Sequence, residues 1–311
     1  MRASRFQGKC LKTAIDMRRF WLVAVLVCGT GAACAACPPA GMTRATLEAL
    51  KTAEWNIADQ ARRQSLAIEM LDCLGSPDPA LRDDFAFEAL SHWMRGKQLT
   101  TLTLQSIRAA LVSQLVPWTP DESGFRRPFS ALALAEVARA ERGQPFLSAA
   151  ERHDLVGIAT TYLVTVRDYR GFDAKDGWRH GVAHGADLLL QLGLNPAVDS
   201  VELKLILAAI ATQIMPSGAH FYSYGEGDRL MMPVFYIGRR DALTAEEWSA
   251  WFAALAAQRT KADPATQTSL AARHNLSQFL LELYASLKES GTPEMQTRML
   301  PGVVAAIKSL S

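Results

Sequence analysis

The 311-residue sequence lacks the short motifs that identify several enzyme classes. It contains no G-x-S-x-G nucleophile elbow, Walker loop or dinucleotide fingerprint, and the region after residue 37 contains no C-x-x-C pair. These absences argue against a serine hydrolase, a nucleotide-binding protein and a thioredoxin-like redox protein.

Positive charge is scarce once the first 36 residues are set aside. These residues hold six of the 33 basic side chains and one of the 31 acidic ones, so the remainder carries 27 basic against 30 acidic groups. That remainder has a net charge of −3 and no basic patch that could hold a phosphate backbone. We therefore expect no nucleic-acid partner.

Long apolar runs are absent too, apart from a short one near the N-terminus. From Met17 to Cys37 the sequence has a basic start, a short apolar run and a tail of small residues, the layout of a secretory signal peptide. The run is too short to span a bilayer comfortably. We predict that residues 1–36 are a signal peptide, with Met17 as a candidate start. The mature chain is then periplasmic or secreted, with no transmembrane span.

Cysteine is rare in the expected mature chain, where only Cys37 and Cys73 remain. Two cysteines in an exported chain predict one disulfide, which would tie the mature N-terminus to the second helix. The alternative is a lipid anchor on Cys37. The tripeptide before it, residues 34–36, lacks the leucine usual three positions ahead of a lipidated cysteine. This favours the disulfide.

No convincing alternating β-pattern occurs, and nearly everything after Cys37 predicts helix. Apolar residues recur at three- and four-residue steps in "TLEALKTAEW" and "ARRQSLAIEMLDCL". The aromatic segment 219–238 suggests a hairpin, but its glycines and the helical spacing from Asp228 onward argue against one.

Helix-start signals divide the chain into about eleven helices. Capping boxes are predicted at Ser148 with Glu151 and at Thr244 with Glu247, and cap-then-proline pairs stand at 263–264 and 292–293. We predict an all-α fold class: stacked antiparallel helices in an α/α superhelix of HEAT-like type, forming a single domain over residues 37–311.

The stretch "DGWRHGVAHGADLL", residues 176–189, is the first candidate site. On a helix beginning near residues 176–177, His180, His184 and Asp187 lie at i, i+4 and i+7 and share one face. Such a set can bind zinc or a similar divalent ion, or transfer protons. A packed helix contact, in which the histidines and the aspartate satisfy each other, is the structural alternative.

Two neighbouring stretches add charged residues. In "VRDYRGF" (166–172), we expect Arg167 or Arg170 to pair with Asp187 or Asp176, or to hold an anionic ligand. In "HFYSYGEGDRL" (220–230), Glu226 could complete a metal shell and Arg229 could orient an anionic substrate, although Glu226 and Asp228 also suit a helix N-terminus.

A resemblance joins these stretches. "FRRPFSALAL", "RDYRGFDAKDGWRHGVAHGADLLLQL", "YGEGDRL" and "HNLSQFLLELY" are similar to the ordered motifs of the bacterial domain-of-unknown-function family 2785. The likeness runs from about residue 74 to residue 287. Pro128 and the pair Gly227-Asp228 depart from the family pattern. The resemblance implies an all-helical, superhelical fold and supplies no activity.

Two hypotheses for function follow. The first is a binding or scaffold protein of the cell envelope, with a peptide, glycan or protein ligand contacted by Trp178, Arg170, Glu226 and Arg229. The second is a metal-dependent or acid/base enzyme, a hydrolase or lyase. It would use His180, His184 and either Asp187 or Glu226, with a divalent metal as its cofactor.

Overall fold

The described part of the protein is almost entirely helical. The computed structural model describes residues 37–116, 121–260 and 266–310. Within these ranges twelve α-helices pack in sequential antiparallel pairs, which confirms the predicted all-α fold of stacked helices. The helices are α1 (Arg44–Thr52), α2 (Gln60–Glu69), α3 (Glu88–Arg95), α4 (Thr101–Leu115), α5 (Arg126–Gly143), α6 (Ala149–Thr165), α7 (Gly181–Gly193), α8 (Ser200–Ile214), α9 (Glu226–Gly238), α10 (Ala245–Thr260), α11 (Gln267–Ser290) and α12 (Pro293–Lys308).

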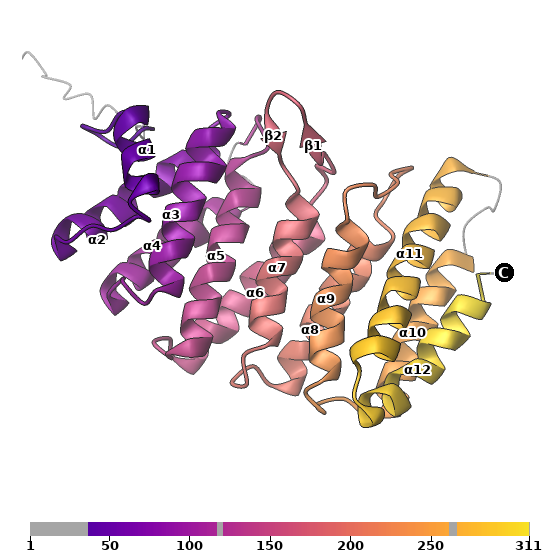
Figure 1. Cartoon of the computed structure of the whole chain (residues 1–311). Helices are drawn as coiled ribbons and strands as arrows, with labels where there is room; N and C mark the ends of the chain where they lie inside the picture. Colours follow the sequence, from indigo (N-terminus) through magenta and orange to yellow (C-terminus); the bar gives the residue numbers. More distant parts are fainter. Residues whose placement is uncertain (1–36, 117–120, 261–265, 311) are drawn as a thin grey trace, which may run out of the picture. The chain divides into compact units, whose positions relative to one another are not determined.

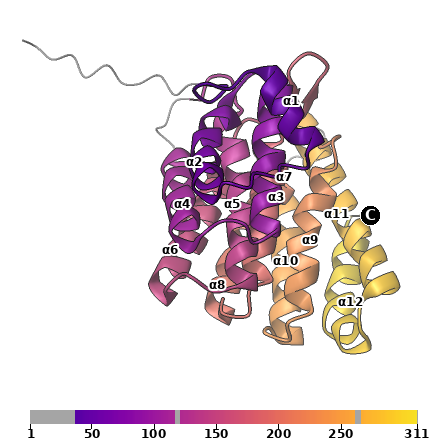
Figure 2. The same cartoon turned by 60° about the vertical axis from the view of Figure 1, so that its left-hand side comes forward.

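Helices α3 to α9 and α11 form two layers. Helices α3, α5, α7, α9 and α11 follow one another side by side in one layer (Figure 1). Helices α4, α6 and α8 form the second layer, and Figure 2 shows them together on one side of α5 and α7. A 3₁₀ segment (Met70–Gly75) and a π-helical segment (Ala80–Phe87) link α2 to α3.

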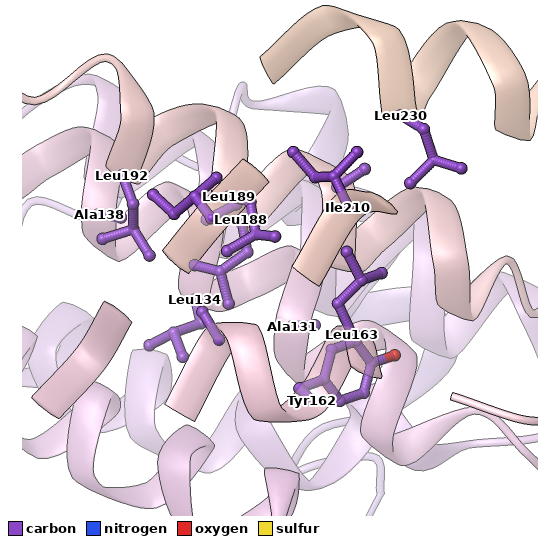
Figure 3. Close-up of a cluster of buried hydrophobic side chains, with 14 of the residues drawn as sticks. Ala131, Leu134, Ala138, Tyr162, Leu163, Leu188, Leu189, Leu192, Ile210 and Leu230 are labelled. Atoms are coloured by element: carbon purple, nitrogen blue, oxygen red, sulfur yellow. The ribbon is translucent and has the colours of Figure 1, made fainter. Parts of the chain in front are cut away.

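Helix α7 lies at the centre of the buried core. Figure 3 shows Leu188, Leu189 and Leu192 of α7 in one buried cluster with side chains of four neighbouring helices. These side chains are Ala131, Leu134 and Ala138 of α5, Tyr162 and Leu163 of α6, Ile210 of α8 and Leu230 of α9. Helix α7 approaches α6 closely because Gly185 has no side chain. A Cβ there would lie 3.0 Å from side-chain atoms of both Leu163 and Tyr162. Burial of this apolar surface is the main stabilising force of the stack.

The predicted helix starts are largely confirmed. Ser148 and Glu151 form a reciprocal capping box at α6, and Thr244 and Glu247 do the same at α10. Helix α12 begins at Pro293 behind its Thr292 cap. The pair at 263–264 lies outside the described residues.

The structure contains a β-hairpin that the sequence does not predict. Strands β1 (Phe172–Asp173) and β2 (Gly177–Trp178) pair antiparallel just before α7. The expected helix start at residues 176–177 is therefore wrong, because these residues belong to the hairpin and α7 begins at Gly181. The Asp173 carboxylate accepts hydrogen bonds from the backbone N–H groups of Lys175 and Asp176, which closes the turn.

The predicted disulfide between Cys37 and Cys73 is present. It ties the start of the described chain to the buried 3₁₀ segment after α2. Within the described ranges, no helix combines the length and apolar composition needed to cross a membrane. The predicted signal peptide, residues 1–36, lies outside the described part of the chain.

Candidate functional site

His180 joins the hairpin to α7. It is the N-cap of α7 and adopts a left-handed conformation, with φ of 55°. This conformation is uncommon for a residue other than glycine, and it turns the chain from the hairpin into the helix. The ring Nε2 lies 3.0 Å from the Tyr224 carbonyl oxygen. Because a carbonyl only accepts, Nε2 carries the hydrogen of this bond.

His184 lies one helical turn further, in the core. Its side chain is buried, its ring meets Phe129 edge-on at 5.0 Å, and its Nδ1 has no hydrogen-bond partner. Burial holds the pKa of His184 well below its ordinary value, and the neighbouring His180 and Arg229 lower it further. His184 is therefore a neutral imidazole at physiological pH. Burial also lowers the pKa of His180, and nearby Glu226 opposes that shift.

Asp187 is held by an arginine from α9. Arg229 donates Nε to Asp187 Oδ1 at 2.8 Å and Nη2 to the other carboxylate oxygen, a bidentate pair. The expectation that Arg167 or Arg170 pairs with Asp187 or Asp176 is wrong. Helix α9 packs directly beside α7, and this places Arg229 against Asp187.

Two of the other three charged groups of that expectation, Asp176 and Arg170, have nearer partners. Asp176 pairs with Arg179, three residues along the chain. Arg170 pairs with Asp168, with Nε 2.8 Å from a carboxylate oxygen. Local carboxylates thus pair with Arg170 and Arg179, whereas Arg167 donates to the backbone carbonyls of Val164 and Val166.

Glu226 is the first residue of α9, two residues earlier than the sequence predicts. Its carboxylate is buried and accepts the backbone N–H of Tyr224 at 2.9 Å. His180 donates to the carbonyl of the same residue. The two polar side chains therefore fix both backbone groups of Tyr224.

Three of the four predicted metal ligands, which come from α7 and α9, are engaged with other groups. Asp187 is bound by Arg229, and Glu226 and His180 are bound to Tyr224. In the portion of the chain that the structure describes, no group of three or more His, Cys, Asp or Glu side chains is placed to hold a metal ion.

Three aromatic side chains stand exposed beside this cluster. Phe172, Trp178 and Tyr224, here called the hairpin surface, are 49%, 38% and 42% exposed. The Trp178 ring lies 5.1 Å from that of Phe172 and 5.8 Å from that of Tyr224, and it stacks on His180. Trp178 was predicted from sequence as a binding residue. Phe172 and Tyr224 were not, although both lie in the stretches that the sequence singled out.

A cleft of about 520 Å³, here called the hairpin cleft, adjoins the hairpin surface. Arginines, aspartates and aromatic rings line it: Arg167, Asp168, Tyr169, Arg170, Gly171, Phe172, Asp173, Arg179, His220 and Tyr224. Of the predicted binding residues, Arg170 lines this cleft. Trp178 borders it through Phe172 and Tyr224, whereas Glu226 and Arg229 lie outside its lining.

Two arginines fasten the hairpin to the helices below. Arg82 is fully buried and donates to the carbonyl of Asp176 at 2.9 Å. Arg82 and Arg179 both stack on the Phe125 ring, with guanidinium carbons 4.0 and 4.3 Å from its centroid. Arg82 also forms an ion pair with Asp83, at 2.7 Å. Burial raises the pKa of Asp83 to about 6.

These features define a class: an all-helical protein of stacked antiparallel helices that carries a small hairpin and an exposed aromatic surface at one helix start. Residues 118–285 match the family described as "Protein of unknown function (DUF2785)". The match covers more than half of the chain, so the chain belongs to this family, as its motifs predict. Comparisons with curated proteins and with solved structures return no match.

Proposed function

We propose that this protein is a binding protein of the cell envelope, periplasmic or secreted after removal of residues 1–36. It recognises a peptide, glycan or protein ligand through the hairpin surface and the hairpin cleft. The observation that carries the proposal is the cluster of three exposed aromatic rings, in which Trp178 contacts both Phe172 and Tyr224, beside an arginine-lined cleft.

The composition of this surface suits recognition. Tryptophan, tyrosine and arginine dominate the side chains that contribute most to binding at protein interfaces. Two arginines at the cleft, Arg167 and Arg170, are solvent-exposed, and Arg167 donates only to the backbone carbonyls of Val164 and Val166. A ligand that covers the rings and accepts from these guanidinium groups gains both apolar burial and charge-assisted hydrogen bonds.

The polar cluster gives this surface a fixed shape. Glu226 and His180 hold the Tyr224 backbone, and the Asp187–Arg229 pair joins the helices from which those two residues come. A surface that is ordered before binding loses less conformational entropy on association. In this account the histidines and carboxylates position the binding residues.

Site-specific photocrosslinking tests the proposal. Photoreactive benzoylphenylalanine is introduced in place of Phe172, and, as a control, in place of Tyr284, which is 37% exposed on α11. After irradiation of intact cells we expect a discrete adduct at position 172 and none at position 284. Tyr224→Ala should weaken the adduct. Equal adducts at both positions, or none at position 172, would contradict the proposal.

The enzyme hypothesis is the second candidate. The buried Nδ1 of His184, which has no hydrogen-bond partner, is the observation that favours it. In that case His180, His184 and either Asp187 or Glu226 would hold zinc or a similar divalent ion, or would transfer protons. The metal content of the purified protein, compared with that of His180→Ala/His184→Ala, separates the metal-dependent form from the binding role.

A further inference from the structure

A second cavity lies at the other end of α5 from the hairpin. It has a volume of about 350 Å³ and is formed by the end of α3, the start of α4 and the last two turns of α5. Its lining begins at Glu136, ten residues along α5 from Arg126, so at 1.5 Å per residue the helix separates it from the hairpin end of α5 by roughly 15 Å. This cavity, here called the α5 cavity, is therefore independent of the hairpin cleft.

The wall of the α5 cavity is largely apolar. Its apolar part is formed by Met94, Leu99, Leu104 and Phe146, and the polar side chains of Thr101 and Gln144 also line the cavity. The first three side chains are otherwise well buried in the stack. A volume of this size is within the range of pockets that hold one small ligand.

Its rim is strongly basic. Arg95, Lys97, Arg139 and Arg142 line the cavity with one carboxylate, Glu136. Arg95 binds Glu136 through two hydrogen bonds of 2.8 and 2.6 Å, and Arg139 binds the same carboxylate at 3.2 Å.

The other two cations of the rim have no such neutralising partner. Arg142 donates to the amide oxygen of Gln191, and Lys97 is exposed. No carboxylate of the described chain forms an ion pair with either of them. The five charged groups therefore leave a surplus of positive charge on a mature chain whose net charge is negative.

Helix dipoles account for part of this surplus. Helices α3 and α5 both end at the cavity, and each C-terminus carries a partial charge of about −0.5. Arg95 and Arg142 occupy the last turns, where cations offset that charge. Four cations face one carboxylate and two such helix ends, so a positive excess remains above the apolar side chains.

We propose that the α5 cavity binds an anionic amphiphile. Its carboxylate or phosphate head lies at the rim beside Lys97, Arg139 and Arg142, and its hydrocarbon part packs against Met94, Leu99, Leu104 and Phe146. The head gains charge-assisted hydrogen bonds and the chain gains apolar burial.

Isothermal titration of the full mature protein tests this inference with four defined probes. Decanoate stands for a free fatty acid and decyl phosphate for a phosphorylated lipid head, while decanol and decyltrimethylammonium share the chain without the anion. We expect saturable 1:1 binding of at least one anion, at least tenfold tighter than of decanol, that weakens as salt is raised. No binding of either anion in the millimolar range, or equal binding of decanol, would overturn the inference.

Variants locate the bound ligand. Lys97→Ala and Arg139→Ala each keep the apolar wall, and we expect their combination to weaken binding of the anion at least tenfold. The double variant should still melt cooperatively, because Arg95 keeps both of its hydrogen bonds to Glu136. Arg167→Ala, at the hairpin cleft, is the matched arginine control and should bind as the parent does. Unchanged affinity in the double variant would refute the site. Neither result depends on the hairpin surface, so the two proposals fail separately.

Discussion

Single polar residues in this protein hold backbone and helices in place around Tyr224. His180 and Glu226 bind its carbonyl and its N–H group, and Arg229 ties Asp187 to the helix that begins with Glu226. The sequence predicts that His180, His184 and Asp187 lie close together, since their spacing follows from helix geometry. It does not predict that Arg229 binds Asp187, because that contact depends on which helix packs beside α7.

Removal of Arg229 should destabilise the protein. In Arg229→Met the half-buried Asp187 carboxylate loses both hydrogen bonds of its charged partner, and we expect a loss of about 2 kcal/mol in the free energy of unfolding. Urea denaturation measures it. The control is Lys204→Met, which breaks the more exposed pair with Glu247 and should cost less than about 1 kcal/mol. Equal losses of unfolding free energy in the two variants would show that the Asp187–Arg229 pair stabilises the protein no more than the exposed Lys204–Glu247 pair.

His184 should make stability depend on pH. Its pKa in the folded protein lies well below 6.5 because it is buried, whereas the unfolded chain takes up a proton near pH 6.5. Stability is therefore fully present above about pH 6.5 and falls as the pH drops below it. In His184→Gln this loss should be smaller, by up to about 1.4 kcal/mol for each pH unit.

Unfolding free energies of the parent and His184→Gln at pH 6.5, 5.5 and 5.0 test this pH dependence. Asp83 acts in the opposite sense: its folded pKa of about 6 exceeds its usual value of 3.8, so its contribution declines as the pH rises between the two. Because Asp83 is present in both proteins, the difference between them isolates His184. Parallel curves would show that His184 does not resist protonation in the fold.

Among the structural elements, the hairpin is the one that the sequence does not predict. Its strands are two residues each, too short for an alternating pattern, and its turn depends on Asp173 and on the left-handed Gly177, with φ of 77°. The helices are predicted well because apolar spacing and caps repeat over many residues. The hairpin depends on hydrogen bonds within its own turn and on its contact with Arg82, and neither gives a repeating sequence pattern.

Substitution of Gly177 should loosen the hairpin. In Gly177→Ala the new Cβ would lie 2.9 Å from Arg82 Nη2, in a backbone conformation that costs an L-residue about 1–2 kcal/mol. We expect a loss of that size in stability, together with weaker crosslinking at position 172. Gly157→Ala is the control: it lies in α6 with nothing within 4 Å of a new Cβ, and it should be neutral or slightly stabilising. If both variants behave alike, the hairpin does not depend on Gly177.

The whole molecule follows the fold that its sequence predicts. Apolar residues at helical spacing, capping boxes and proline starts are repeated along the chain, so errors at one boundary do not change the fold class. The start of α9 was misplaced by two residues and the all-α stack was still correct. The proposed binding surface is harder to predict, because it contains exposed groups such as Phe172 and Tyr224 that come from separate stretches of the chain.

The disulfide should stabilise the whole domain. Cys37 and Cys73 are 36 residues apart, and a cross-link of that span restricts the unfolded chain. We expect Cys37→Ala combined with Cys73→Ala to lose about 3 kcal/mol in the free energy of unfolding. The intact mass of the purified protein checks the chemistry: two missing hydrogens indicate the disulfide, and a diacylglycerol adduct would indicate the lipid anchor instead.

The most direct test of the central claim, that the histidines position a binding surface, is the metal content of the purified mature protein without a histidine tag. It is measured beside His180→Ala/His184→Ala, and thermal melting of both proteins accompanies it. We predict no stoichiometric zinc, manganese or iron in the parent, and a lower melting temperature in the variant. Nearly one metal ion per chain in the parent, with none in a variant that melts like the parent, would contradict the account and establish a metal centre.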